Sequence, residues 1–242
     1  MQAVILAGGL GTRLRPITHQ ITKPMVPVAG KPYLEHQLRL LREQSITDVI
    51  LLVGYLGHQI EDYFADGRGF GLTVRYSHEA SPLGTGGALR EARNLLDQRF
   101  LLIYGDSYLP IEYRGPMERL AACGAAGAIV LCDNRREDTS VTSNIALDSA
   151  GYVTRYEKDK PSDPELQYVD AGVLALDRSI LGLVPPDGIV SLEKEVFPKL
   201  IAGRQLVGHI VTQRFYDIGN PERLRLFEEY LRHDHHSDPL SH

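Results

Sequence analysis

Residues 3–13 read Ala-Val-Ile-Leu-Ala-Gly-Gly-Leu-Gly-Thr-Arg, an apolar run that empties into a glycine cluster. The glycines are Gly8, Gly9 and Gly11. The run Ala3–Ala7 predicts a buried strand, and glycines at its end expose backbone N–H groups to which an anion can bind. Arg13 and, ten residues later, Lys23 add positive charge at the same place. This stretch predicts a phosphate site.

Two well-known phosphate motifs do not fit this loop. The loop of P-loop NTPases closes with Gly-Lys-Ser or Gly-Lys-Thr, whereas Thr12-Arg13-Leu14 follows the glycines here. The dinucleotide fingerprint of Rossmann oxidoreductases needs a third glycine where Leu14 stands, and no ribose-binding acid is evident after Val53. Neither class is therefore predicted, and a plain strand-to-helix turn is the remaining non-functional interpretation of the glycines.

The longer stretch LAGGLGTRLRPIT, followed by TKPMVPVAGKP, resembles the signature of the sugar-1-phosphate nucleotidylyltransferases. The resemblance runs from Met1 to about Leu231. Among short relatives it is greatest to the D-glycero-D-manno-heptose 1-phosphate guanylyltransferases, and the N-acetylmuramate 1-phosphate uridylyltransferases are nearly as similar. It implies an Mg²⁺-dependent transfer from an NTP, GTP or UTP, to a sugar 1-phosphate, giving an NDP-sugar and pyrophosphate. The base and the sugar both stay open.

Composition sets wider limits on the chain. It has 242 residues, of which 43% are hydrophobic and 24% charged, so we expect one globular domain. A net charge of −5 argues against a nucleic-acid surface. Two cysteines are too few for a disulfide framework, and neither a basic leader nor an apolar run of about 20 residues is evident. We expect a cytoplasmic protein without a membrane segment; a homo-oligomer is left open.

Strand and helix patterns alternate through the first half, which predicts an α/β, Rossmann-like fold with a mostly parallel mixed sheet flanked by helices. The expected domain spans residues 1–232, with a nucleotide-binding half to about 110 and a sugar-phosphate half at 111–232; residues 233–242 are expected to be a flexible tail. Strands are expected at 3–7, 49–53, 72–76, 100–104, 128–132, 145–147, 152–156, 169–176, 205–212 and 215–217. Helical faces are expected over 34–41, 60–64, 88–95, 192–200 and from 224.

Two aspartates are the predicted metal ligands. Asp106 ends the strand FLLIYGD, and Asp217 lies in FYDIGNPERL. Mg²⁺ takes one or two carboxylates and completes its shell with water and phosphate oxygens. Taken alone, either aspartate could cap a turn or a helix. The resemblance implies that both hold the metal, that Arg13 stabilises charge on the triphosphate and that Lys23 bridges the reacting phosphates.

Two segments are expected to bind the nucleotide. The first segment is the backbone of Leu6, Ala7 and the glycine loop, together with Thr12. The loop Pro82–Gly87 resembles the family's Pro-x-Gly-Thr-Gly-Gly-Ala segment, and its expected contacts are Gly84, Thr85 and Gly86. Glu79 could accept hydrogen bonds from base or ribose, or be a solvated loop residue.

The sugar phosphate is expected in the second half of the chain. Glu157-Lys158 resembles the family's Glu-Lys segment, in which the carboxylate binds sugar hydroxyls and the ammonium binds the phosphate. Asp170 is expected to contact a hydroxyl, and the remaining expected contacts are Asp106, Ser107 and Asn144. Ser107 and Thr142-Ser143-Asn144 depart from the family's usual residues, which leaves the sugar open.

A non-catalytic nucleotide-binding regulatory module on the same scaffold is the alternative function. Such a module could lose the metal pair or the sugar-phosphate lysine. The chain has Asp106, Asp217 and Lys158. These residues favour an enzyme.

Overall fold

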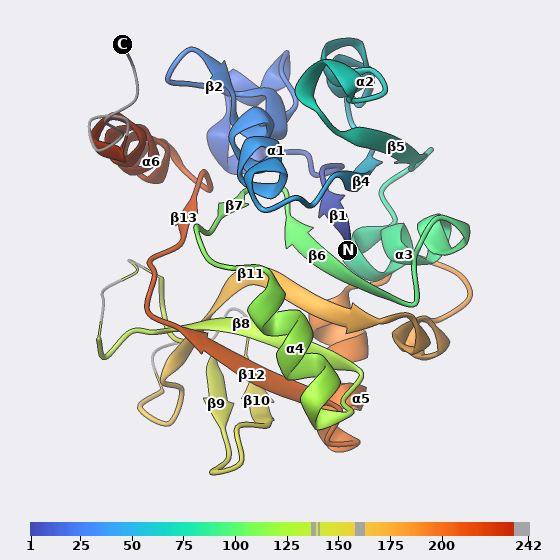
Figure 1. Ribbon diagram of the computed structural model, residues 1–242, viewed down its shortest axis with the longest axis vertical. Helices are drawn as coiled ribbons and strands as arrows, with labels where there is room; N and C mark the ends of the chain where they lie inside the picture. The colour runs from blue at the N-terminus through green and yellow to red at the C-terminus, as the bar shows by residue number, and fades with distance from the viewer. Residues whose placement is uncertain (137–138, 140, 158–162, 235–242) are drawn as a thin grey trace.

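Four parallel strands form the nucleotide-binding side of the sheet. In the computed structural model they are β1 (Gln2–Leu6), β4 (Asp48–Val53), β5 (Thr73–His78) and β6 (Arg99–Tyr104), in the spatial order β5-β4-β1-β6 (Figure 1). β1 is central, and Leu6 at its end pairs with Leu52 and Tyr104. The structure describes residues 1–136, 139, 141–157 and 163–234. The apolar β1, β4 and β6 are buried on both faces, as parallel strands covered by helices should be.

The sheet continues beyond β6 with mixed strand directions. The added strands are β11 (Tyr168–Asp177), β8 (Gly127–Asp133), β12 (Leu206–Val211), β9 (Ile145–Leu147) and β10 (Val153–Tyr156). β11 is antiparallel to β6, β8 and β9, whereas β12 is parallel to β8. The predicted single α/β domain with a mostly parallel mixed sheet flanked by helices is confirmed.

Helices cover both faces of this sheet. They are α1 (Tyr33–Glu43), α2 (His58–Phe64), α3 (Gly84–Glu91), α4 (Arg114–Cys123), α5 (Phe197–Ala202) and α6 (Pro221–Asp234). One buried cluster joins α1, α2 and α4 to one face through residues such as Leu38, Phe64 and Leu120. A second joins α3 and α5 to the other face through Leu89 and Phe197.

Short helical turns and ribbons connect these elements. The turns are Thr12–Leu14, Ile17–His19, Lys23–Met25, Arg68–Phe70, Ala92–Asn94, Arg178–Leu183 and the π turn Leu192–Val196. The ribbons are β2 (Pro27–Val28) with β3 (Lys31–Pro32), and β7 (Ser107–Tyr108) with β13 (Tyr216–Asp217).

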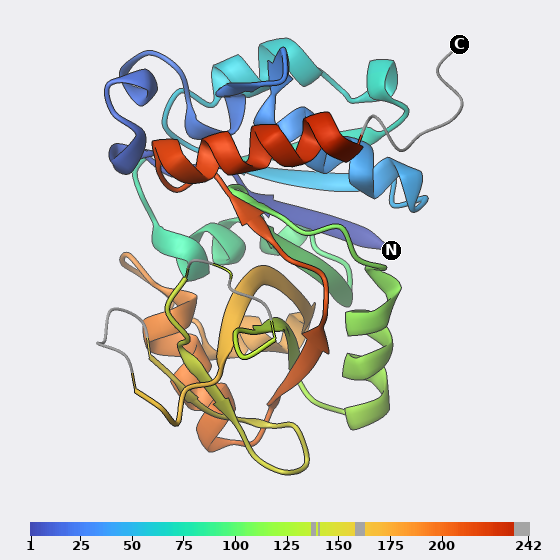
Figure 2. The ribbon, with the colours of Figure 1, turned by 90° about the vertical axis from the view of Figure 1, so that its left-hand side faces the viewer.

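A third buried cluster joins the end of the chain to its beginning. Phe227 of α6 packs edge-on against Tyr33, at 5.1 Å between ring centroids, and in a tilted arrangement against Tyr108, at 4.8 Å. Figure 2 shows α6 lying across the N-terminal segments. Because α6 follows β13 directly, this packing holds Asp217 beside the strand end of β6.

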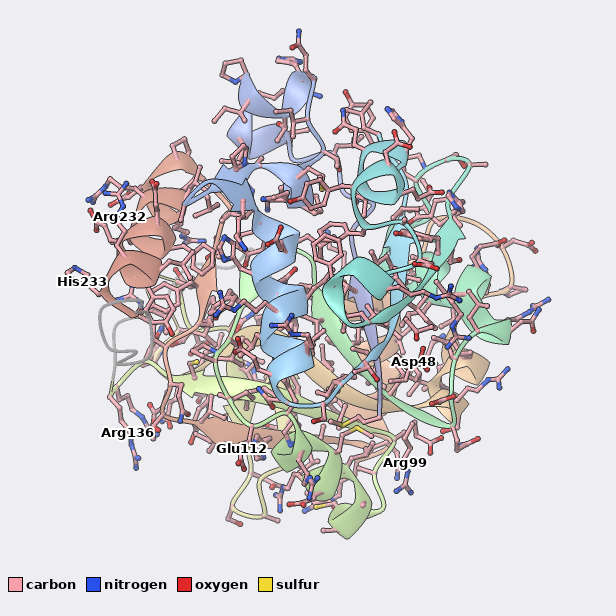
Figure 3. All side chains as sticks on the ribbon, turned by 45° about the horizontal axis from the view of Figure 1, so that its top comes forward. Asp48, Arg99, Glu112, Arg136, Arg232 and His233 are labelled. Carbon is pink, nitrogen blue, oxygen red and sulfur yellow. The ribbon has the colours of Figure 1, made fainter. Side chains whose placement is uncertain are left out.

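The surface charges are distributed over many elements. In Figure 3 the labelled side chains of Arg99, Arg136 and Arg232 lie far apart around the outline of the molecule. α6 includes residues 233 and 234 of the expected tail, whereas residues 235–242 lie outside the described part of the chain. Among the described residues, no helix combines the length and apolar character needed to cross a bilayer.

Candidate active site

The carboxyl ends of β1, β4 and β6 meet so closely that glycine is required there. The Gly105 N–H donates to the Leu6 carbonyl at 3.0 Å. A Cβ on Gly105 would lie 2.3 Å from that carbonyl oxygen, and one on Gly8 would lie 3.2 Å from the Gly54 nitrogen. The loops after the three strands therefore form one surface. Ligands of open α/β sheets bind at this edge.

A cavity of about 400 Å³ opens at this edge. The predicted site residues that line it are Leu6, Ala7, Gly8, Gly9, Gly11, Thr12, Arg13, Lys23, Glu79, Gly84, Thr85 and Asp106. The predicted residues outside its lining are Gly86, Ser107, Asn144, Glu157, Asp170 and Asp217. Lys158 lies outside the described residues. The cavity thus joins three predicted segments far apart in sequence: the glycine loop, the start of α3 and the end of β6. Gly84–Gly87, expected in a loop, form the first turn of α3.

Asp106 is held at the mouth of β6 by groups from two other elements. The Lys23 ammonium donates to Asp106 Oδ2 at 2.5 Å, with 12% of the lysine side chain and 30% of the aspartate side chain exposed. Gln37 of α1 donates to the Tyr104 and Ser107 carbonyls, at 3.0 and 2.6 Å, which lie on either side of Asp106 along the chain. Asp106 therefore has a fixed, partly accessible carboxylate paired with a cation.

Asp217 lies close to the backbone of Asp106 because β13 pairs with β7. In that ribbon Asp217 is opposite Ser107, and the Ile218 N–H donates to the Asp106 carbonyl at 3.1 Å. The Asp217 carboxylate accepts from the Gly219 N–H at 2.6 Å and from Arg223 at 3.0 Å. Two aspartates separated by more than a hundred residues thus occupy adjoining backbone positions.

Arg13 reaches the same region from the glycine loop. A Cβ on Gly219 would lie 3.7 Å from Arg13 Nη1 and 2.6 Å from Asp217 Oδ1. Both Arg13 and Gly219 line the cavity, and Arg13 is exposed. Its guanidinium is therefore accessible to an anion that enters the cavity.

The donor set of the two aspartates suits Mg²⁺. Carboxylate oxygens are the ligands that this hard cation prefers, and one or two protein carboxylates suffice when phosphates complete the shell. Over the described ranges of the chain, no group of three or more histidine, cysteine or acidic side chains forms a complete metal site. A site of two carboxylates completed by substrate fits this arrangement.

Glu79 stands against the glycine loop on the other side of the cavity. Its Oε2 accepts from the Leu83 N–H at 2.7 Å, and its Oε1 would lie 2.9 Å from a Cβ on Gly8. Burial raises the pKa of Glu79, and the Leu83 hydrogen bond opposes that rise only in part. Glu79 is therefore a partly buried carboxylate that the Leu83 N–H holds next to the glycine loop.

Tyr104 and Glu193 also line the cavity, and the sequence predicted a role for neither. Glu193 is only 6% exposed and accepts hydrogen bonds from Ser191 Oγ at 2.7 Å, Thr85 Oγ1 at 2.9 Å and Tyr104 Oη at 3.0 Å. It lies in the π turn Leu192–Val196, a local distortion often found at functional sites. The stretch SLEKEV carries no signal for this turn. A charged residue between apolar helical positions was the only available clue.

A polar cluster lies at the ends of β9, β10 and β11. Tyr156 donates to Asp170 at 2.9 Å, and Asn144 Oδ1 accepts from the Asp170 N–H at 3.2 Å. The Glu157 N–H donates to the Asn144 carbonyl at 2.8 Å. Burial first, and then Asp170 and Glu193, raise the pKa of Tyr104, so its hydroxyl is a proton donor at neutral pH.

Ser107 differs in its surroundings from the rest of the predicted sugar contacts. It is 7% exposed, and a Cβ on Gly172 would lie 2.2 Å from its hydroxyl oxygen. The side chain therefore packs under β11. Ser107 is therefore a buried residue next to the cavity, whereas the neighbouring Asp106 lines it.

Known proteins of similar sequence identify the family of the chain. A family model described as nucleotidyl transferase matches residues 2–232. The chain is 31% identical to a D-glycero-alpha-D-manno-heptose 1-phosphate guanylyltransferase of Aneurinibacillus thermoaerophilus, over 96% of this chain and 99% of that one. It is 32% identical to a mannose-1-phosphate guanylyltransferase of Mycobacterium tuberculosis, over 92% of this chain and 62% of that protein. It also spans 55% of a Synechocystis UTP-glucose-1-phosphate uridylyltransferase, at 30% identity over 83% of this chain.

Solved structures are similar over nearly the whole chain. HddC from Yersinia pseudotuberculosis, complexed with GMP-PN, has a TM-score of 0.79 and 27% identity, covering 95% of this chain and 99% of that one. A putative glucose-1-phosphate thymidylyltransferase from Bacillus anthracis has a TM-score of 0.83 at 21% identity, covering 96% of this chain and 95% of that one, and shows the shared fold. The chain therefore belongs to the nucleotidyl transferase family.

Proposed function

We propose that this protein transfers a nucleotidyl group from an NTP to a sugar 1-phosphate, and that it is a guanylyltransferase acting on a heptose or hexose 1-phosphate. The observation that carries the proposal is the convergence of the glycine loop, Arg13, Lys23 and Asp106 on one cavity. The heptose enzyme matched over 99% of its length and the GMP-PN complex of HddC support guanine and a heptose. Uridylyl transfer to a hexose or muramate 1-phosphate is the second candidate, supported by the uridylyltransferase relative.

In the proposed reaction an oxygen of the sugar phosphate attacks the α-phosphorus of the NTP. The new P–O bond forms as the bond to the β-phosphate oxygen breaks, and pyrophosphate leaves with the bonding electron pair. Both reactants are anions, so the protein must supply positive charge and alignment rather than a nucleophile of its own. Arg13 and Lys23 supply that charge, and the open backbone at Gly9 leaves room for the triphosphate.

Asp106 and Asp217 are the residues that would hold Mg²⁺. Bound there, the cation would neutralise charge on the phosphates and orient the α-phosphate. Lys23 would then be released from Asp106 to contact a phosphate oxygen. These roles rest on the Lys23–Asp106 pair and on the β7–β13 ribbon that adjoins it.

The sugar phosphate is proposed to bind between the cavity wall and the Asp170 cluster. Hydroxyl-rich ligands need fixed acceptors, and Glu193, Asp170 and Asn144 are each held by hydrogen bonds. Glu157 and Lys158 belong to the same proposed subsite. We place the reaction in the cytoplasm, where nucleoside triphosphates are available.

The test is pyrophosphate release from a panel of NTPs and sugar 1-phosphates, with Mg²⁺ and with EDTA. We expect release with GTP and a heptose or hexose 1-phosphate, abolished by EDTA, and an NDP-sugar product by mass spectrometry. Release with UTP alone would support the second candidate. Nucleotide binding in calorimetry without pyrophosphate release from any pair would instead support the non-catalytic regulatory module.

A further inference from the structure

Tyr33 combines complete burial with a hydroxyl that lacks a partner. It is the first residue of α1 and is 0% exposed. Its hydroxyl oxygen is buried and makes no hydrogen bond within the described structure. By contrast, the buried Tyr113 donates to the Leu109 carbonyl at 3.1 Å and Tyr104 donates to Glu193. Buried hydroxyls nearly always have partners, so an unpartnered one requires an explanation.

The position of Tyr33 points to the two aspartates. Its ring belongs to the buried cluster that contains Tyr108 and Ile218. Tyr108 lies two residues after Asp106, and Ile218 directly follows Asp217. Burial is the largest cause of the raised pKa of Tyr33, and the charges of Asp106 and Asp217 come next. The hydroxyl therefore lies in the field of both carboxylates while bonding to neither.

The two carboxylates have other hydrogen-bond donors in the present structure. Asp106 accepts from Lys23, and Asp217 accepts from Arg223 and from the Gly219 N–H. A divalent cation that binds these carboxylate oxygens competes with the Lys23 and Arg223 cations for them. When Lys23 or Arg223 no longer bonds to a carboxylate oxygen, the protonated Tyr33 hydroxyl can donate to that oxygen.

We propose that Tyr33 is a positioning residue, whose hydroxyl donates to a carboxylate oxygen of the Asp106–Asp217 pair when that pair holds a divalent cation. The inference rests on the proposed function, because it requires the cation to bind at this pair. Donors behind metal-ligating carboxylates fix the orientation of the ligands. The Tyr33 hydroxyl would thus lack a hydrogen-bond partner in the metal-free protein and gain one when the cation binds.

The test measures Mn²⁺ binding to the whole chain by electron paramagnetic resonance, with Tyr33→Phe as the variant. This change keeps the ring and its contact with Phe227 and removes only the hydroxyl. We expect Mn²⁺ affinity to fall roughly tenfold, the typical loss when a partner of a metal ligand is removed. We also expect the metal-free variant to be at least as stable to heat as the parent, because the hydroxyl it loses is unpartnered.

A matched control is Tyr113→Phe, which removes a buried hydroxyl bonded only to a backbone carbonyl in the described structure. It should lower thermal stability and leave Mn²⁺ affinity unchanged. Because the chain has twelve tyrosines and no tryptophan, Mg²⁺ should also produce a tyrosine difference spectrum in the parent that is reduced in Tyr33→Phe and kept in Tyr113→Phe.

Two results would overturn the inference, and they are distinguishable. If Asp217→Asn weakens Mn²⁺ binding but Tyr33→Phe binds like the parent, Tyr33 has no role at the pair and the proposed function stands. If the parent binds no Mn²⁺ with or without GTP, or if Asp217→Asn binds it like the parent, the metal pair itself is wrong and the role of Tyr33 is wrong with it.

Discussion

Asp106 is a residue whose proposed role in the reaction can be separated experimentally from a role in folding. It lies at the exposed end of β6, paired with Lys23, outside the three buried clusters. We predict that Asp106→Asn lowers turnover roughly a hundredfold or more, because the proposed metal loses a charged ligand. Thermal stability should change little. Pyrophosphate release and thermal unfolding measure the two effects.

Asp48→Asn is the matched control for that change. Asp48 also flanks a parallel strand and is paired with a cation, Arg75 at 2.8 Å, but it lies at the opposite, amino-terminal edge of the sheet. Turnover should match the parent. Equal activity in Asp106→Asn and Asp48→Asn would remove Asp106 from the proposed site.

Glu79 gives a prediction about pH. Its pKa is raised above the ordinary value of 4.5, mainly by burial, so the folded protein holds the proton more tightly than the unfolded chain. The free energy of unfolding therefore falls as the pH rises from about 4.5 through the raised pKa. Glu79→Gln should raise the melting temperature at pH 7 and lose that advantage below about pH 4.

The same variant should bind nucleotide more weakly, by roughly tenfold, because it loses a charged acceptor beside Gly8. Calorimetric titration with an NTP at pH 7 measures this. A variant that is more stable and binds the nucleotide as tightly as the parent would show that Glu79 is only a loop residue.

Among the elements, the π turn Leu192–Val196 gives a prediction about the sugar. It places Glu193 among hydroxyls of Thr85, Ser191 and Tyr104, where the carboxylate can also accept from a sugar hydroxyl. Glu193→Gln should raise KM for the sugar phosphate roughly tenfold and leave KM for the NTP nearly unchanged. Steady-state kinetics with each substrate varied separately distinguish these constants. An equal rise in both would indicate a general disturbance of the cavity.

The approach of β1 to β6 gives a second prediction at this scale. A Cβ on Gly105 would lie 2.3 Å from the Leu6 carbonyl oxygen, whereas nothing lies within 4 Å of one on Gly9. Gly105→Ala should cost about 1–3 kcal/mol of stability, and Gly9→Ala should cost far less. Urea unfolding measures both. Equal costs would mean that the two strand ends separate easily.

Strands and helices with a clear pattern of apolar residues could be predicted from the sequence. Elements that depend on contacts with distant residues could not. The apolar run at 100–104 and the observed strand Arg99–Tyr104 agree within one residue, as do 145–147 and β9. α4 (Arg114–Cys123) was not predicted, because Gly115 and Pro116 obscure its first turn. The expected helix over 192–200 is a π turn followed by α5, a distortion that depends on contacts with Thr85 rather than on local spacing.

The site was predictable only where a motif lies next to a strand end. The glycine loop and Asp106 both follow β-strands whose partners are neighbours, so one principle places them together. The proximity of Asp217 needs the β7–β13 ribbon, which spans most of the second half of the chain. Tyr33 and Glu193 belong to no motif, and only the packed molecule shows what surrounds them.

On the scale of the whole molecule, α6 connects the two ends of the chain through Phe227. This ring is 0% exposed and contacts the rings of Tyr33, His36 and Tyr108. Phe227→Ala should cost about 3–5 kcal/mol of stability and should weaken Mn²⁺ binding, because β13 and Asp217 depend on this packing. Unfolding in urea and paramagnetic resonance measure the two effects.

Phe70→Ala is the control for that prediction. Phe70 contacts Tyr63 and Phe64 beside α2 and is only partly buried. Its loss should lower stability less and leave Mn²⁺ binding unchanged. If Phe227→Ala retained the parent's Mn²⁺ affinity, α6 would not be needed to hold Asp217 in place.

The pairing of β13 with β7 has a consequence for the protein while it is being made. A ribosome delivers the glycine loop before Asp106, and it delivers Asp106 more than a hundred residues before Asp217 and the helix that covers its ribbon. Domains acquire their structure as the nascent polypeptide lengthens. A nascent chain that stops short of Asp217 would therefore contain the glycine loop and Asp106 but only one of the two proposed metal ligands. We expect it to be inactive until Asp217 and α6 have been synthesised.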